Sequence, residues 1–241
     1  MPGSEATAYV ALGDSISIDD YSGGSGRGGA SLFFANRDED FPEWRGRDLR
    51  TLDPGTTFAL LATDGATTRT LVQSQLPRFR ALGFRPTVVT LTIGGNDLLG
   101  AYGDTDAALG VIAAVRAAVD LVLAELAGTA PAARIAVGTV YDPSDGTGDA
   151  VRLGLPPWPD AVAVLAELND TLRAAAAAHG AVVAEIAAAF QGHGLLAGDP
   201  SRREPRPVER DLWFCNLIEP NAWGADGVRS AFWAAVNDGR R

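Results

Sequence analysis

The segment AYVALGDS (Ala8–Ser15) decides the fold, because an apolar run suited to a buried strand ends there in a tight, glycine-marked turn. The segment VVTLTI (Val88–Ile93) has the same character and ends in GGND (Gly94–Asp97). The carboxyl ends of parallel strands lie at one edge of their sheet, where open α/β folds bind ligands. The two segments therefore predict that Ser15 and Asn96 come together at one sheet edge.

Strands and helices alternate along the rest of the chain. The predicted strands are Tyr9–Leu12, Phe58–Leu61, Val88–Ile93, Ile135–Val140 and Val182–Ile186, and helical periodicity is clearest at Ala107–Ala127, Ala161–Ala178 and Ala225–Val236. This alternation predicts an α/β fold whose parallel sheet is covered on both faces and joined by right-handed crossovers. No linker interrupts the 241 residues, so we expect one domain over residues 1–241.

The composition narrows the range of partners. The formal net charge of -10 and a pI near 4.6 disfavour nucleic acid, whose binding depends on clustered cations. Met1–Glu5 has no basic region followed by an apolar run, and we expect no apolar stretch of about 18 residues, so the sequence predicts a cytoplasmic protein without a membrane partner. The single Cys215 excludes an internal disulfide, and its neighbours Phe214 and Leu217 predict a buried thiol.

A third polar turn, TDGATT (Thr63–Thr68), follows the second predicted strand. Gly65 would offer a backbone N–H there, at a position with no room for a side chain. Ser15 would supply a hydroxyl at the start of the first crossover helix, and Asn96 would supply an amide N–H. Acyl transfer through a serine nucleophile requires a hydroxyl beside several N–H donors, although each motif by itself also fits an ordinary cap or turn.

Taken together and in order, Gly13–Ser15, Gly65 and Gly94–Asp97 resemble the motifs of the SGNH hydrolases, also called GDSL esterases and lipases. The resemblance spans most of the chain. It implies a three-layer α/β/α sandwich with a flavodoxin-like five-stranded parallel sheet, and a serine esterase that needs no cofactor. It also implies that Ser15 is the nucleophile and that the Ser15 backbone, the Gly65 backbone and the Asn96 side chain are oxyanion donors.

The last family block departs from this pattern. Where the family has Asp-x-x-His before the final helix, this chain has NLIEPN (Asn216–Asn221), with Asn216 in place of the aspartate and Glu219 in place of the histidine. A glutamate with a pKa of about 4.3 accepts a proton roughly 3 kcal/mol less readily than a histidine with a pKa near 6.5. Glu219 can therefore act as a base only if burial raises its pKa.

Three hypotheses for the general base follow. His193 is the favoured one, because it lies on a glycine-flanked loop after the fifth predicted strand and can reach the catalytic edge. Glu219 is the alternative, and Asn216 would orient whichever base is used. The third hypothesis is a non-catalytic SGNH-like binding protein that has lost its base. His179 is explained by its position at a helix end, beside Gly180.

Acidic residues near the expected site are candidates for substrate binding. They are Asp14, Asp19, Asp20 and Asp97, together with Asn216. Asp19 and Asp20 also fit as dipole partners in a first helical turn. The acidic clusters at Asp38–Asp40 and Asp142–Gly146 do not match the twelve-residue calcium loop, so no metal site is predicted.

Long connections in a compact domain are often functional, so we expect the walls of the substrate site, including Trp44 and Trp158, in three of them: Ser17–Asp53, Tyr141–Pro159 and Gln191–Asp211. The pattern Gly24-x-Gly26-x-x-Gly29 matches a dinucleotide fingerprint but lies too far beyond the first strand, which argues against a dinucleotide-dependent oxidoreductase. The sequence therefore predicts a hydrolase that cleaves carboxylic esters of small molecules.

Overall fold

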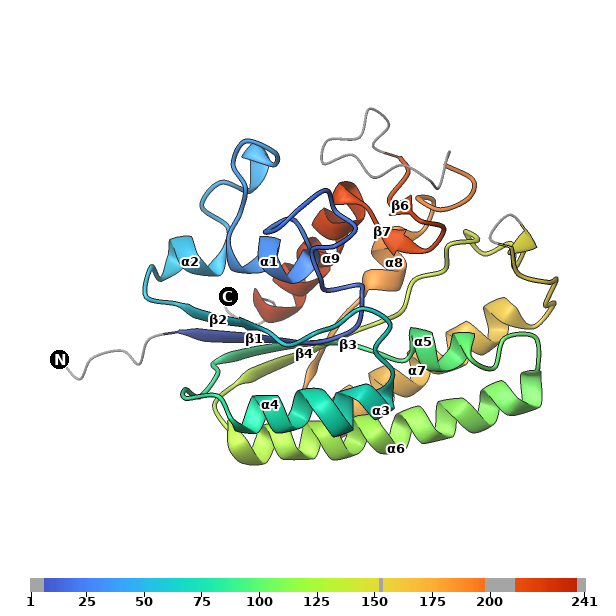
Figure 1. The fold of residues 1–241 in the computed structure, drawn as a ribbon, viewed down its shortest axis with the longest axis horizontal. Helices are drawn as coiled ribbons and strands as arrows, with labels where there is room; N and C mark the ends of the chain where they lie inside the picture. Colours follow the sequence, from blue (N-terminus) through green and yellow to red (C-terminus); the bar gives the residue numbers. More distant parts are fainter. Residues whose placement is uncertain (1–6, 152–153, 198–210, 238–241) are drawn as a thin grey trace.

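The computed structural model describes residues 7–151, 154–197 and 211–237. Its main sheet has five parallel strands in the order β2-β1-β3-β4-β5, as Figure 1 shows. The strands are β1 (Ala8–Gly13), β2 (Thr57–Leu60), β3 (Val88–Thr92), β4 (Arg134–Gly138) and β5 (Val182–Ala184). Each predicted strand is present, and the order reverses at β1, so the carboxyl ends of β1 and β3 lie side by side as expected.

Helices cover both faces of the sheet, which confirms the three-layer α/β/α architecture (Figure 1). One face carries α1 (Gly29–Phe34), α2 (Leu49–Leu52), α8 (Ile186–Phe190) and α9 (Ala222–Asn237), with the short 3-10 helix η1 (Pro42–Trp44) in the connection between α1 and α2. The other face carries α3 (Thr68–Thr70), the π-helical turn η2 (Leu71–Gln75), α4 (Leu76–Arg80), α5 (Gly95–Leu99), α6 (Thr105–Thr129) and α7 (Ala161–Ala178).

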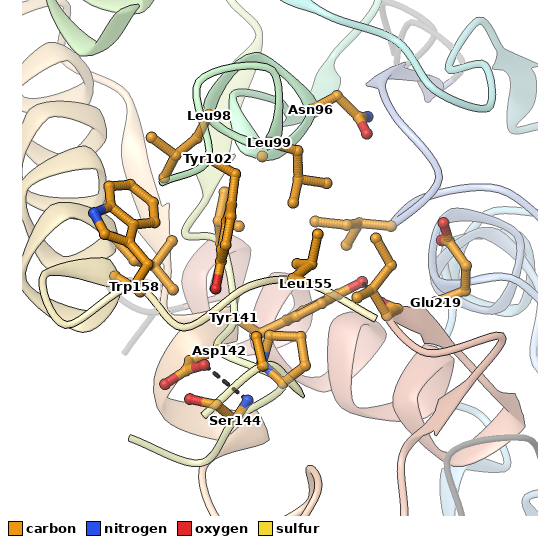
Figure 2. Close-up of a pocket in the computed structure, with 18 of the residues that line it drawn as sticks. Asn96, Leu98, Leu99, Tyr102, Tyr141, Asp142, Ser144, Leu155, Trp158 and Glu219 are labelled. Carbon is orange, nitrogen blue, oxygen red and sulfur yellow. Dashed lines mark hydrogen bonds between the residues drawn. The ribbon is translucent and has the colours of Figure 1, made fainter. Parts of the chain in front are cut away.

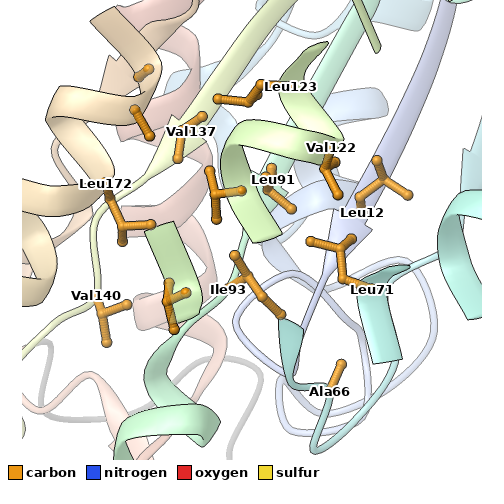
Figure 3. Close-up of a cluster of buried hydrophobic side chains, with 14 of the residues drawn as sticks. Leu12, Ala66, Leu71, Leu91, Ile93, Val122, Leu123, Val137, Val140 and Leu172 are labelled. Carbon is orange, nitrogen blue, oxygen red and sulfur yellow. The ribbon is translucent and has the colours of Figure 1, made fainter. Parts of the chain in front are cut away.

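The strands are apolar on both faces because each face packs on a helical layer. Along β1, Val10 and Leu12 join the cluster under α6 and α7, whereas Tyr9 and Ala11 join the cluster under α1 and α9. Figure 3 shows the first of these clusters, in which side chains from strands and helices interdigitate. The sheet is therefore a rigid platform for the turns at its edge.

The predicted strand ends differ from the observed ones by a few residues, for physical reasons. Val140 lies beyond β4 because its backbone N–H and C=O both bond to the buried side chain of Asn169. Ile186 starts α8 instead of ending β5. The cap predicted at His179 and Gly180 is confirmed, since His179 is the C-cap of α7 and Gly180, which follows it, has φ of 67°.

Helix α6 departs from one expectation. The helix has 25 residues, and an 18-residue window within it has a mean hydropathy of 2.0, so it is long and apolar enough to cross a membrane by length and composition alone. The expectation that no stretch reaches this length was therefore wrong. In this structure the buried side chains of α6, such as Val115, Val119 and Leu123, pack in the cluster on the sheet.

A small two-stranded antiparallel sheet, which the sequence did not predict, precedes α9. It consists of β6 (Phe214–Cys215) and β7 (Glu219–Pro220), and Cys215 is paired with Glu219. Cys215 is fully buried, as predicted. Asn221 then starts α9, because its side-chain oxygen accepts the backbone N–H groups of Trp223 and Gly224.

Candidate active site

The turn after β1 holds Ser15 at the sheet edge. Gly13 has φ of 127°, and a Cβ there would lie 2.0 Å from the backbone oxygen of Thr92, so only glycine fits. The backbone N–H of Asp14 donates to that same oxygen at 3.1 Å, and the hydroxyls of Ser17 and Thr92 are 2.9 Å apart. The nucleophile turn is therefore fastened to the end of β3.

The sequence predicted that Ser15 lies at the start of a helix, and the structure shows that it does not. It lies in a turn in which the Ser17 N–H donates to the Asp14 carbonyl at 3.2 Å, and α1 begins only at Gly29. The intervening loop is organised by Asp19, whose carboxylate accepts the backbone N–H groups of Gly26 and Gly28. The start of α1 consequently lies 14 residues after the position expected.

Gln75 is a positioning residue that the sequence analysis missed. Its fully buried side-chain amide accepts the Gly13 N–H at 2.8 Å and donates to the Gly13 carbonyl at 2.7 Å. Gly13 pairs with Thr92 of β3, and on its other side, beyond the end of β2, these two bonds and the Thr63 N–H satisfy its backbone and fix the chain that leads into Ser15. A glutamine within a helical segment has no sequence signal for such a role.

The second and third polar turns are joined by side chains of the third. The Asn96 amide nitrogen donates to the Ala66 carbonyl at 3.0 Å, which leaves its second N–H available. The Asp97 carboxylate accepts the Thr68 hydroxyl at 2.6 Å and the Thr68 backbone N–H at 3.0 Å. Asp97, predicted to bind substrate, is thus engaged in holding the two turns together.

Gly65 is exposed and has φ of 63°, but a Cβ there would meet nothing within 4 Å. The expected lack of room for a side chain was wrong. Glycine is favoured at this position because the backbone is left-handed, which L-residues rarely adopt. Gly65 does not line the pocket described below, whereas Ser15 and Asn96 both do.

One pocket, which holds about 140 Å³ and is drawn in Figure 2, lies beside Ser15 and Asn96. Much of its wall comes from the connection Tyr141–Pro159, and Trp158 lines it as predicted. Trp44 lies elsewhere, packed 4.2 Å from the Arg229 guanidinium and against the Trp233 ring. The apolar lining includes Leu98, Leu99, Val140, Leu155, Leu165 and Ile218. Parts of two expected wall segments, residues 152–153 and 198–210, lie outside the described residues.

Glu219 lines this pocket together with Ser15, and the Ser15 hydroxyl favours the charged form of its carboxyl and so lowers its pKa. The pKa of Glu219 is raised to about 7, chiefly by burial; the Ser15 hydroxyl lowers it, and the charges of Asp64 and Asp14 add to the rise. One carboxylate oxygen, Oε2, is buried and has no hydrogen-bond partner. The structure thus places beside Ser15 a carboxyl group with the desolvation that a basic glutamate needs.

The turn that presents Glu219 has an unusual backbone. Asn216 and Leu217 have φ of 45° and 75°, and the Ile218 N–H donates to the Asn216 carbonyl at 3.0 Å to close a γ-turn. The Tyr141 hydroxyl donates to the Ile218 carbonyl at 2.7 Å and so ties this turn to the pocket wall. Asn216 itself is exposed in the turn, so its observed role is conformational.

His193 is not brought to the pocket. Its Nδ1 lies 2.7 Å from the Asp211 carbonyl, and its ring stacks on Trp213 with a centroid distance of 3.9 Å. His193 is absent from the residues that line the pocket, and its ring is engaged on the surface of the 191–197 loop. His179 bonds Asp120 at 3.0 Å beside the end of α7, in keeping with a structural role.

The remaining acidic candidates differ in burial. Asp14 is buried, lines the pocket and accepts the Ile16 N–H, and burial raises its pKa to about 6. Asp19 lies outside the pocket and precedes α1, so it is not a dipole partner in a first helical turn, and Asp20 is exposed beside it. Among the described residues no group of three or more His, Cys, Asp or Glu side chains is arranged to hold a metal ion.

Comparison with known proteins gives a consistent result. The model of the GDSL-like Lipase/Acylhydrolase family matches residues 11–225. The extracellular lipase from Streptomyces rimosus is 27% identical with a TM-score of 0.64, over 95% of this chain and 100% of that one. Phospholipase A1 from Streptomyces albidoflavus NA297 is 24% identical with a TM-score of 0.58, over 96% and 100% of the chains.

The similarity to this phospholipase and a more distant one, both under 25% identity, show the fold alone. A variant of Axe2, an acetyl-xylooligosaccharide esterase from Geobacillus Stearmophilus, is 17% identical with a TM-score of 0.60, over 95% of this chain and 94% of that one. No curated protein sequence matches the chain.

Proposed function

Because the chain belongs to the GDSL-like lipase/acylhydrolase family, we propose that it hydrolyses carboxylic esters through an acyl-enzyme on Ser15, with Glu219 as the general base. The observation that carries this proposal is that Glu219 lines the same pocket as Ser15, where burial raises the pKa of its carboxyl to about 7. His193, the base favoured by the sequence, bonds to the Asp211 carbonyl and lies outside the pocket lining.

The chemical steps follow from the positions of these groups. The Glu219 carboxylate accepts the hydroxyl proton as Ser15 Oγ attacks the ester carbonyl, and the protonated carboxyl then returns a proton to the leaving alcohol. The oxyanion is stabilised by the backbone N–H of Ser15 and the second N–H of Asn96, which both line the pocket, and the family resemblance adds the backbone N–H of Gly65 as a third donor. A water molecule, deprotonated by Glu219 in the same way, releases the acid and restores Ser15.

The pKa of Glu219 makes this assignment chemically reasonable. A base works best when its pKa lies near the working pH, and burial brings that of Glu219 to about 7, where a histidine base would also titrate. Only the carboxylate form accepts the proton. The rate constant kcat/KM should therefore rise with pH through about 7 and level off above it.

The experiment compares wild type with Ser15→Ala, Glu219→Gln and the matched control His193→Ala, on p-nitrophenyl butyrate and on a fluorophosphonate probe. Ser15→Ala should lose labelling and at least about a thousandfold in kcat/KM. Glu219→Gln should lose about a hundredfold or more, because it cannot accept a proton. His193→Ala should retain nearly full activity.

Two outcomes would overturn parts of the proposal. Loss of activity in His193→Ala with retention in Glu219→Gln would transfer the base to His193. A folded wild type that neither reacts with the probe nor hydrolyses the ester would favour the non-catalytic binding protein, which the departure at Asn216 and Glu219 motivates.

A further inference from the structure

The pocket has an unpaired polar group at the side opposite Glu219. The Tyr102 hydroxyl is buried and has no hydrogen-bond partner, and Figure 2 shows Tyr102 across the pocket from Glu219, with Leu99 and Leu155 between them. The unpaired Oε2 atom of Glu219 lines the same pocket. A buried hydroxyl left unpaired is unfavourable, so a bound molecule that pairs it would gain affinity.

The neighbouring polar groups are bonded to other partners and do not pair with the Tyr102 hydroxyl. The Trp158 indole N–H donates to the Thr105 hydroxyl at 3.0 Å, and the Trp158 ring meets the Tyr102 ring edge to face at 4.9 Å. The Asp142 carboxylate accepts the backbone N–H groups of Ser144 and Gly146. Ring packing therefore holds Tyr102 in place, and its hydroxyl is left for a ligand.

The Tyr102 hydroxyl stays protonated, so it can donate. Burial and the charges of Asp142 and Asp149 raise its pKa above the ordinary value of 10.0. A donor in this position pairs with a neutral oxygen, since the nearby carboxylates oppose a second anion. The complementary group on the ligand is a hydroxyl, carbonyl or ether oxygen.

The space between Tyr102 and Glu219 limits the size and polarity of the ligand. The wall between them is apolar, and the pocket volume of about 140 Å³ is close to that of cavities that accept one benzene ring. Leu98 and Leu99 continue the helix that carries Asn96, so an acyl group held at the oxyanion donors can extend along them toward Tyr102.

We propose that Tyr102 is a specificity-determining residue that selects acyl groups with a short apolar or aromatic stem and a neutral oxygen at the far end. The inference rests on the proposed ester hydrolysis at Ser15. A lost hydrogen bond of this type reduces discrimination about fivefold to tenfold.

The test uses two matched pairs of esters. One is ethyl 3-(4-hydroxyphenyl)propanoate with ethyl 3-phenylpropanoate, and the other is ethyl 6-hydroxyhexanoate with ethyl hexanoate. Hydrolysis is followed by pH-stat titration in wild type and Tyr102→Phe. In at least one pair, Tyr102→Phe should lower the ratio of kcat/KM for the hydroxylated ester to that for its partner about fivefold to tenfold. The unsubstituted ester is the internal control and should change less than twofold.

A binding arm separates this inference from the proposed function. Calorimetry measures Kd for the same esters with Ser15→Ala and with Ser15→Ala combined with Tyr102→Phe, where no turnover is needed. The ratio of affinities should fall by the same factor. An unchanged ratio in both pairs would overturn the role of Tyr102 while leaving hydrolysis intact, and absence of hydrolysis with a changed ratio would overturn the proposed function alone.

Discussion

The two halves of the candidate site are built differently. The strand-end half, formed by the turns that carry Ser15, Gly65 and Asn96, grows directly out of β1, β2 and β3. The hairpin half, formed by β6, β7 and the turn Asn216–Ile218, stands apart from the main sheet and delivers Glu219. The turns of the first half are joined to one another by side-chain hydrogen bonds, whereas the second half leaves Oε2 of Glu219 buried and unpaired.

The two halves also differ in the backbone conformations that position their reactive groups. In the strand-end half, positive φ angles fall on glycines such as Gly13 and Gly94, and the turns are held by the buried amide of Gln75 and the half-buried carboxylate of Asp97. In the hairpin half, positive φ falls on Asn216 and Leu217, which L-residues adopt at a cost. The nucleophile side is thus relaxed and rigid, and the side that carries the proposed base is strained.

The largest expected effect is that of Asp97→Ala, which breaks the link between the second and third turns. Thr68 would lose the acceptor for both its hydroxyl and its backbone N–H. The free energy of unfolding should fall by about 2–3 kcal/mol in urea titrations, and kcat/KM should fall with it. Asp97→Asn keeps one acceptor oxygen and should lose about half as much. Equal stability of Asp97→Ala and wild type would show that the strand ends hold together without this link.

Glu219→Gln should change stability in a pH-dependent way. Its folded-state pKa of about 7 lies above the ordinary value of 4.5, so the stability from its neutral form is present below pH 4.5 and lost as pH rises through 7. Glutamine does not ionise, so the variant does not lose stability in this way as the pH rises. The variant should match wild type near pH 4 and exceed it by about 1–2 kcal/mol at pH 8, measured as Tm and urea midpoint. A constant difference across this range would show that Glu219 is solvated.

The smallest expected effect is that of Leu217→Gly, which relieves the γ-turn. Removal of about 1–2 kcal/mol of backbone strain is partly offset by the greater freedom of glycine in the unfolded chain. The net gain in the free energy of unfolding should be about 0.5 kcal/mol. Gly94→Ala is the opposite control, because Gly94 has φ of 107° and a Cβ would lie 3.3 Å from Leu168. Destabilisation by Leu217→Gly would show that the turn is unstrained.

Much of the strand-end half could be predicted from the sequence, because it depends on local patterns. An apolar run, a glycine and a short polar residue occur together in the chain at each strand end, and parallel strands bring their carboxyl ends to one edge. One exception was the start of α1 at Gly29, since no local pattern indicated that the Asp19 carboxylate would bind the backbone N–H groups of the glycine-rich loop. The space beside Gly65 and the role of Gln75 were others.

Local sequence determined the alternation of strands and helices, the family resemblance, and the meeting of Ser15 with Asn96. Only tertiary structure decided which side chain accompanies Ser15: Glu219 entered the pocket and His193 stacked on Trp213. It also decided the roles of Gln75 and Tyr102. The physical reason is that burial, pairing and pKa depend on neighbours distant in sequence, such as those that surround the Glu219 carboxyl, and no periodicity or spacing encodes them.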